Sequence, residues 1–302
     1  MGNKDLILVS NTAKKKPHSS MGLRTARTVS NVAVYIVLTI MSIIWLIPFV
    51  CIVLQSFRCE FGGMTGYVIP KQWGWDNYVN LFQNTNFKRW FLNTLIVSAA
   101  TAVLQTLFVL CMAYTLSRLR FNGRKFLMNF MLILGMFPGM LTMIIIYRIL
   151  ADMGLTQSNA IPGYILVYCA SSGMGYYISK GFFDTIPKSL DEAARVDGAN
   201  RLQVLFKVIL PLSKPIVIYT MLTAFMGPWA DFVFASYISF NVSDGMNVAV
   251  GINSLVSTPS GIASNYTTFC AGGVCVALPV TILFLFLQKY YVEGVTGGAV
   301  NG

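Results

Sequence analysis

The chain has 302 residues, of which 55% are hydrophobic and 11% charged, against about 25% charged in an ordinary soluble domain. This composition excludes a disordered protein and argues against a water-soluble globule. The net charge of +11 comes from basic residues that lie between long apolar runs, so the question is which side of a membrane they occupy, not which nucleic acid they bind. We therefore predict an all-α polytopic membrane protein without a nucleic-acid partner.

The first segment, residues 1–30, is a basic arm to which the sequence assigns no role. The apolar run that follows it is about twice as long as the 7–15 residues of a signal-peptide core, and no small-x-small cleavage site follows. We expect this run to be a retained signal-anchor helix.

A membrane-spanning helix needs about 20 mostly apolar residues. Six segments meet this requirement and define a predicted transmembrane domain over residues 31–288, followed by a tail over 289–302. The six predicted helices are 31–54, 91–115, 126–147, 160–179, 215–237 and 267–288.

The basic residues predict the orientation. With a cytoplasmic N-terminus, seventeen of the 22 Lys and Arg residues fall inside, and the outside holds only Arg58, Lys71, Lys88, Arg89 and Arg148. Because cytoplasmic loops are enriched in Lys and Arg, both termini are predicted to be cytoplasmic.

Two exported loops are expected. The loop at about 55–90 carries Trp73, Trp75 and Tyr78, which are either interfacial anchors or part of a docking surface. The loop at about 238–266 has no basic residue, and its part 251–266 is rich in Ser, Thr, Asn, Gly and Pro, which is typical of a loop. It is either a passive connector or a segment that reaches into a partner.

The cytoplasmic loop 180–214 carries the most local signals. Ser189 and Glu192 have the spacing of a capping box, and Gly198 is suited to end the helix that they begin. Asn200 and Gln203 have the spacing of a second cap, whose helix is expected to end before Pro211. Two short helices joined by a turn predict a rigid docking element for a cytoplasmic partner.

These residues resemble a known family. Glu192-Ala193-Ala194, Gly198 and Leu210-Pro211 match the EAA loop of binding-protein-dependent ABC importer permeases, with Val208 where the family usually has Ile. Further segments resemble the carbohydrate branch of the family, among them Asn93-Thr94, Ala113-Tyr114, Leu116-Ser117-Arg118, Phe121-Asn122-Gly123-Arg124, Pro138, Leu141-Thr142-Met143, Tyr147 and Gly154-Leu155. The tail from Gln288 to Gly302 resembles the C-terminus of MalG-type maltose permeases, with Asn301 where Lys is usual. The resemblance covers roughly residues 30–302.

The resemblance implies an ABC type I importer fold in a bacterial cytoplasmic membrane, where the chain forms half of a translocation path for maltodextrin-like oligosaccharides. It implies three kinds of protein partner: a second permease subunit, a cytoplasmic ABC ATPase dimer and an extracellular solute-binding protein. The residues implied to couple the ATPase are Glu192, Ala193, Ala194, Asp197, Gly198, Ala199, Leu210 and Pro211. The C-terminal ATPase contact would use Gly294, Thr296, Gly297, Gly298 and Gly302. The loop that enters the binding protein would use Thr258, Pro259, Ser260 and Gly261.

Three residues are candidates for the solute path. Asp231 either bonds a neighbouring helix or lines the path, and Trp229 and Phe232 either stack against a sugar or pack in the membrane. No residue is assigned to a metal, a cofactor or catalysis: the chain has no GxxxxGK[ST] or HExxH motif, and its one histidine, His18, lies in the basic arm. Two alternatives remain, an ion-coupled secondary transporter and an ABC permease for a non-sugar solute. A capped two-helix loop favours the ABC permease, because an ion-driven carrier would not need one.

Overall fold

The computed structural model describes residues 20–60, 67–136, 139–171 and 173–297, without the side chains of residues 20–26, 29, 140, 173–174 and 291–297. Within these ranges the elements are helices, and strand-like pairing is limited to one isolated bridge between Arg58 and Trp73. The chain divides within its first helix into two units, Met1–Cys51 and Ile52–Gly302, which are described separately.

The first unit contains most of helix α1, Ser20–Ser56. From Ser30 onward this helix is long and apolar enough to cross a membrane. Its Ser42 hydroxyl donates to the carbonyl of Leu38 one turn earlier, at 2.7 Å, which satisfies the polar group within the helix itself.

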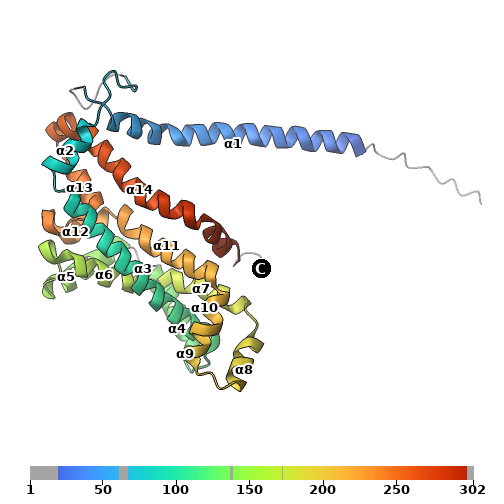
Figure 1. Ribbon diagram of the computed structural model, residues 1–302. Coiled ribbons are helices and arrows are strands. Elements are labelled where there is room, and N and C mark those ends of the chain that lie inside the picture. Colours follow the sequence, from blue (N-terminus) through green and yellow to red (C-terminus); the bar gives the residue numbers. More distant parts are fainter. Residues whose placement is uncertain (1–19, 61–66, 137–138, 172, 298–302) are drawn as a thin grey trace, which may run out of the picture. The chain divides into compact units, whose positions relative to one another are not determined.

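The second unit is built around three long helices. Helix α11 lies between α3 and α14, and α6 and α7 pack along α3 (Figure 1). The bounds in chain order are α2 Asp76–Asn84, α3 Phe87–Arg118, α4 Arg124–Gly135, α5 Gly139–Asp152, α6 Ala160–Ala170, α7 Gly173–Thr185, α8 Lys188–Val196, α9 Arg201–Val204, a π-turn Leu205–Ile209, α10 Leu210–Leu212, α11 Lys214–Ala230, α12 Val233–Ser239, α13 Val248–Ser254 and α14 Pro259–Gly297, with 3₁₀ turns at Gln157–Asn159 and Ser243–Gly245.

Small residues bring the helices of this unit close together. Thr94, Ser98 and Thr101 are fully buried along α3, as small side chains at helix contacts in membranes usually are. Helix α13 approaches α3 at Gly251, where an added Cβ would lie 2.1 Å from the ring of Trp90. The absence of a side chain at Gly251 therefore sets the distance between these two helices.

Three of the predicted spans are confirmed as helices long and apolar enough to cross a membrane: Ser30–Ser56, Phe87–Arg118 and Pro259–Tyr290. A fourth is possible if Arg201–Leu212 and Lys214–Ala230, which meet at 89°, form one broken span.

The expectation of single helices over 126–147, 160–179 and 215–237 is wrong, because each segment is interrupted. Helix α4 ends at Gly135 and α5 begins at Gly139, and the sequence between them contains Pro138, which has no N–H to donate to a helix. Helix α6 ends at Ala170, before a turn at Ser171, and α7 begins at Gly173. Helices α11 and α12 are separated at Asp231–Phe232. Hydropathy alone does not report such interruptions.

The expectation of a loop over 251–266 is also wrong. Helix α13 begins at Val248 and α14 begins at Pro259. Thr258 accepts a hydrogen bond from the amide of Gly261 at 3.1 Å, so Thr258-Pro259 is an N-cap followed by proline at the first helical position. A composition typical of loops therefore marks a helix start here.

The segment before α2 is ordered around a buried charge. Arg58 is 1% exposed and donates to the carbonyls of Tyr67 and Val68 at 2.7 and 3.1 Å, and its Nε lies 3.5 Å from a carboxylate oxygen of Glu60. Asn77 of α2 donates to the Arg58 carbonyl at 2.6 Å. These bonds fix the described residues around Arg58 to one another and to the start of α2.

Candidate functional site

The site with the most local order is the segment from α8 to α10. Helix α8 begins at Lys188, directly after Pro187, and no side chain caps it. The predicted capping box of Ser189 and Glu192 is therefore wrong: Ser189 already lies inside the first turn, where it cannot act as the N-cap.

The end of α8 confirms the predicted role of Gly198. The amide of Gly198 donates to the carbonyl of Arg195 at 3.0 Å and the amide of Ala199 to that of Ala194 at 2.9 Å, a Schellman motif. Gly198 has φ +84°, which is accessible to glycine and strained for a side chain. The turn after α8 therefore has one defined shape.

The second cap is confirmed. Asn200 accepts from the amide of Gln203 at 2.9 Å, and Gln203 accepts from the amide of Asn200 at 2.8 Å. The helix that it starts does not end before Pro211 as predicted, but continues to Leu212. A π-turn makes this possible, because the amide of Leu210 donates five residues back to Leu205 just before the proline, which lacks an amide proton.

A buried ion pair holds α8 to the end of α3. Arg118, whose side chain is 3% exposed, places its Nε 3.1 Å from a carboxylate oxygen of Asp191, which is 15% exposed. The same guanidinium donates to the carbonyl of Ile186, in the connection between α7 and α8, at 2.9 Å. We call these contacts the α3–α8 latch.

A second set of polar contacts lies beside the latch. Ser117 donates to Asp184 of α7 at 2.6 Å, and Lys180 pairs with the other oxygen of Asp184 at 2.5 Å. The end of α3 is thus fixed to both helices that flank the α7–α8 connection.

The predicted coupling residues divide between a packed face and an exposed face. Ala194, Ala199 and Leu210 pack against a buried cluster that includes Tyr114, Phe183 and Ile209. The residues that remain exposed are Glu192, Ala193, Asp197, Gly198 and Pro211. Val196 and Leu202 lie with them and are 87% and 65% exposed. Exposed apolar side chains beside a rigid turn are typical of a surface that binds a partner.

Asp231 lies at the break between α11 and α12. Its carboxylate accepts from the Tyr168 hydroxyl of α6 at 2.6 Å and from the amide of Phe234 at 3.1 Å. Asp231 therefore bonds a neighbouring helix, which is one of its two predicted roles. The indole of Trp229 is 4% exposed and lies edge-on to Phe91, with ring centroids 5.2 Å apart, while Phe232 is 42% exposed.

We expect Asn247→Ala to destabilise the unit around Asp231. Asn247 donates to the carbonyls of Asp231 and Pro228 at 2.6 and 3.2 Å and caps α13 through the amide of Val250. Losing the cap and leaving buried carbonyls unpaired should cost about 1–3 kcal/mol. Thermal unfolding in detergent measures this, with Asn253→Ala, an exposed residue of the same helix, as the control. Equal melting temperatures for the two variants would contradict the assignment.

The remaining predicted residues lie at the two ends of α14. Thr258, Pro259 and Ser260 are exposed at its start, next to half-buried Gly261. At the other end the helix continues to Gly297, so the predicted tail over 289–302 is helical up to that residue. Gly298 and Gly302 lie outside the described residues, as do the side chains around Gly294 and Thr296.

Sequence reasoning did not assign a role to Arg118, although Leu116-Ser117-Arg118 contributes to the family resemblance. A basic residue at the end of an apolar helix is common as a topology signal. Its partner Asp191 is 73 positions away, so nothing local in the sequence predicts the pair.

Long and interrupted apolar helices are typical of a membrane transport component. Residues 110–297 match the family described as binding-protein-dependent transport system inner membrane component, and the chain belongs to this family. The maltodextrin transport system permease protein MdxG of Bacillus subtilis (strain 168) is 33% identical over 93% of this chain and 100% of its own. The galactooligosaccharides transport system permease protein GanQ of the same organism is 34% identical over 89% of this chain and 94% of its own.

A solved structure shows the same fold. A chain in the crystal structure of a bacterial ABC transporter involved in the import of the acidic polysaccharide alginate superposes with a TM-score of 0.76 at 22% identity, over 88% of this chain and 98% of that chain.

Proposed function

We propose that this chain is one of two permease subunits of an ABC importer for oligosaccharides, of which maltodextrins are the first candidates. A separate ATPase dimer drives the transport, and an extracellular solute-binding protein delivers the sugar. The names of the relatives support an oligosaccharide as the transported solute, and the family description supports a binding protein as a partner.

The observation that carries the proposal is the α3–α8 latch beneath an exposed apolar surface. A force applied at Val196 passes through α8 to Arg118 and so to α3, the helix that packs along α11. The lack of a nucleotide-binding motif in this sequence supports a separate ATPase as the source of the ATP-driven motion.

We propose that the three interrupted segments each cross the membrane as a helix pair, which gives six spans with both termini in the cytoplasm. The distribution of Lys and Arg supports this orientation, and it places α8–α10 on the cytoplasmic side. Interrupted helices suit a transport path, because non-helical backbone at membrane depth is tolerated where it lies inside protein or lines a water-filled cavity.

The proposal is tested by transport in proteoliposomes. The chain, co-expressed and purified with its second permease and ATPase, is reconstituted with its solute-binding protein, and uptake of labelled maltodextrins is measured with ATP inside the vesicles. We expect uptake that requires both ATP and the binding protein. Uptake driven by an ion gradient without ATP would favour a secondary transporter, and ATP-driven uptake of a non-sugar solute alone would favour the other alternative.

We expect a cysteine at Ser260 to report entry of the α13–α14 turn into the binding protein. Ser260 is exposed at the start of α14, beside Thr258 and Pro259, in a part of the chain without basic residues. In a background free of accessible cysteines, Ser260→Cys should crosslink to the cleft of the binding protein in the ATP-bound state and much less at rest. Thr185→Cys, exposed at the α8 end of α7, is the control. A Ser260 crosslink no stronger than this control would leave the turn as a connector.

The C-terminal part of α14 is proposed as a second ATPase contact, through residues from Gly294 to Gly302. The resemblance of this tail to that of MalG-type permeases supports the proposal. Truncation from Thr296 onward removes most of this contact and should weaken assembly or coupling, whereas full transport and complex yield in the truncated protein would contradict the proposal.

A further inference from the structure

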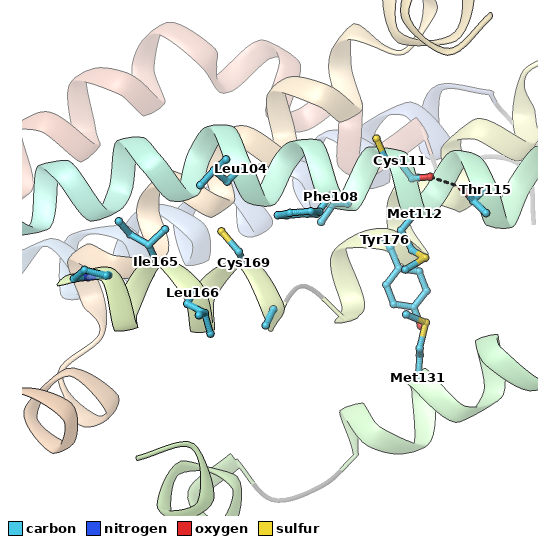
Figure 2. Close-up of a pocket in the computed structure, with 13 residues that line it drawn as sticks. Leu104, Phe108, Cys111, Met112, Thr115, Met131, Ile165, Leu166, Cys169 and Tyr176 are labelled. Carbon is cyan, nitrogen blue, oxygen red and sulfur yellow. Dashed lines mark hydrogen bonds between the residues drawn. The ribbon is translucent and has the colours of Figure 1, made fainter. Parts of the chain in front are cut away.

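A large apolar cavity lies in the second unit, and its lining ends at Thr115, about one turn of α3 before Arg118 of the latch. Its volume is about 920 Å³, and residues of α3, α4, α6 and α7 line it. Figure 2 shows Leu104 and Phe108 of α3 opposite Ile165 and Cys169 of α6. The lining is almost entirely hydrocarbon and sulfur, so it offers a sugar too few groups to replace the hydrogen bonds that its hydroxyls make with water.

The cavity has the length of one leaflet. Along α3 it extends from Leu104 to Thr115, which is about 16 Å at the rise of an α-helix and close to half of the roughly 30 Å hydrocarbon core. An acyl chain of a single leaflet matches this length and this apolar character.

A buried hydroxyl without a partner lies at one end of the cavity. Tyr176 of α7 is 3% exposed, and its phenol oxygen has no hydrogen-bond partner among the described residues. Figure 2 shows its ring directed toward Met131 of α4. Thr115, the other hydroxyl of the lining, already donates to the carbonyl of Cys111 at 2.9 Å. The phenol is therefore the one lining hydroxyl left to bond an occupant.

Basic residues lie beyond the same end. Arg120 follows Thr115 by five residues, and Arg124 and Lys125 begin α4. Arg124 precedes Met131 by seven residues, which places the two on one face of α4 about 10 Å apart along its axis. None of these three cations has an ion-pair partner within the described ranges, whereas neighbouring Arg118 and Lys180 do.

We propose that this cavity is a binding site for an anionic phospholipid. One acyl chain fills the space between α3 and α6, the Tyr176 phenol donates to the ester carbonyl, and Arg120, Arg124 and Lys125 attract the phosphate. Basic pockets between membrane helices recognise anionic head groups in this way. The site is independent of the sugar and of the coupling surface.

The test uses the intact transporter complex in phosphatidylcholine nanodiscs that contain a minor fraction of phosphatidylglycerol with a diazirine on one acyl chain. After illumination, mass spectrometry locates the label. We expect labelling of the cavity segments of α3 and α6 to exceed, by several-fold, both that of the exposed face of α5 and that obtained with phosphatidylcholine carrying the same diazirine.

Matched variants separate a filled cavity from general lipid contact. Leu104→Trp should fill the cavity and remove most of the label, while Leu107→Trp, one turn along α3 and outside the lining, should leave it unchanged; the two leucines are 40% and 44% exposed. Tyr176→Phe, and separately Arg124→Gln with Lys125→Gln, should each lower phosphatidylglycerol labelling several-fold. Uniform labelling of all lipid-facing helices would overturn the proposal. So would equal labelling in Leu104→Trp and Leu107→Trp, or a crosslink from a cavity residue to the second permease subunit in place of lipid.

Discussion

Replacing Arg118 with Met should release α8 from α3 and uncouple ATP hydrolysis from transport. The variant leaves the Asp191 carboxylate without its partner, and breaking a buried pair in this way typically costs about 3–5 kcal/mol. Because Asp191 is 15% exposed, we expect a cost of about 3 kcal/mol, at the lower end of this range. Hydrogen exchange of the α8 amides should then accelerate by about two orders of magnitude, since each 1.4 kcal/mol is tenfold.

Two further variants make this result specific. Arg120→Met removes an exposed arginine two residues away, without an ion pair in the described structure, and should leave the exchange of the α8 amides unchanged. The double variant Arg118→Met with Asp191→Leu replaces the pair by apolar groups and should restore much of the protection of α8. Protection of α8 in Arg118→Met equal to that of the unmodified chain would show that the latch does not hold the helix.

Gly198→Val should abolish coupling while the protein still inserts into the membrane. The position has φ +84°, and no atom lies within 4 Å of an added Cβ, so the effect comes from backbone strain and not from a clash. Forcing a β-branched residue into this conformation should cost about 1–3 kcal/mol, which alters the turn between α8 and α9. If this strain is borne in the coupled state, sugar-stimulated ATPase activity and uptake should fall by about fivefold to 150-fold, because each 1.36 kcal/mol is tenfold.

Gly181→Val is the matched control for this variant. Gly181 is an exposed glycine of α7 with open space around its Cβ position and an ordinary helical φ. The same substitution there should change uptake little. Equal uptake by the two valine variants would mean that the positive φ of Gly198 has no role in coupling.

The parts of the site that are local in sequence could be predicted. Gly198 ends α8 and Asn200 caps α9 because each signal acts within four residues of its own position. The capping box of Ser189 and Glu192 was not realised because α8 has Pro187 at its N-cap and so starts two residues earlier than predicted. The carboxylate of this turn that forms an interaction is that of Asp191, which pairs with Arg118 of α3.

The interruptions of the helices were not predicted from the sequence, and neither was the start of α14. An apolar window records whether a segment suits a membrane, not whether its backbone is continuous, so the breaks at Ser171 and Asp231 have no hydropathy signal. The polar composition of 251–266 predicted a loop, although Thr258-Pro259 has the pattern of a helix start. The lipid cavity and the α3–α8 latch depend on contacts between distant segments, which no window of the sequence contains.

The central claim is that the exposed surface of α8 and α9 receives the ATPase. Its most direct test is a cysteine at Val196, the most exposed apolar residue of α8, in a complex whose six native cysteines have been replaced. Val196→Cys should crosslink to the ATPase subunit in high yield and Ser260→Cys should not, with a yield for Val196→Cys that changes when ATP binds. A crosslink from Val196→Cys to the solute-binding protein, or none to the ATPase above the Ser260→Cys level, would contradict the account.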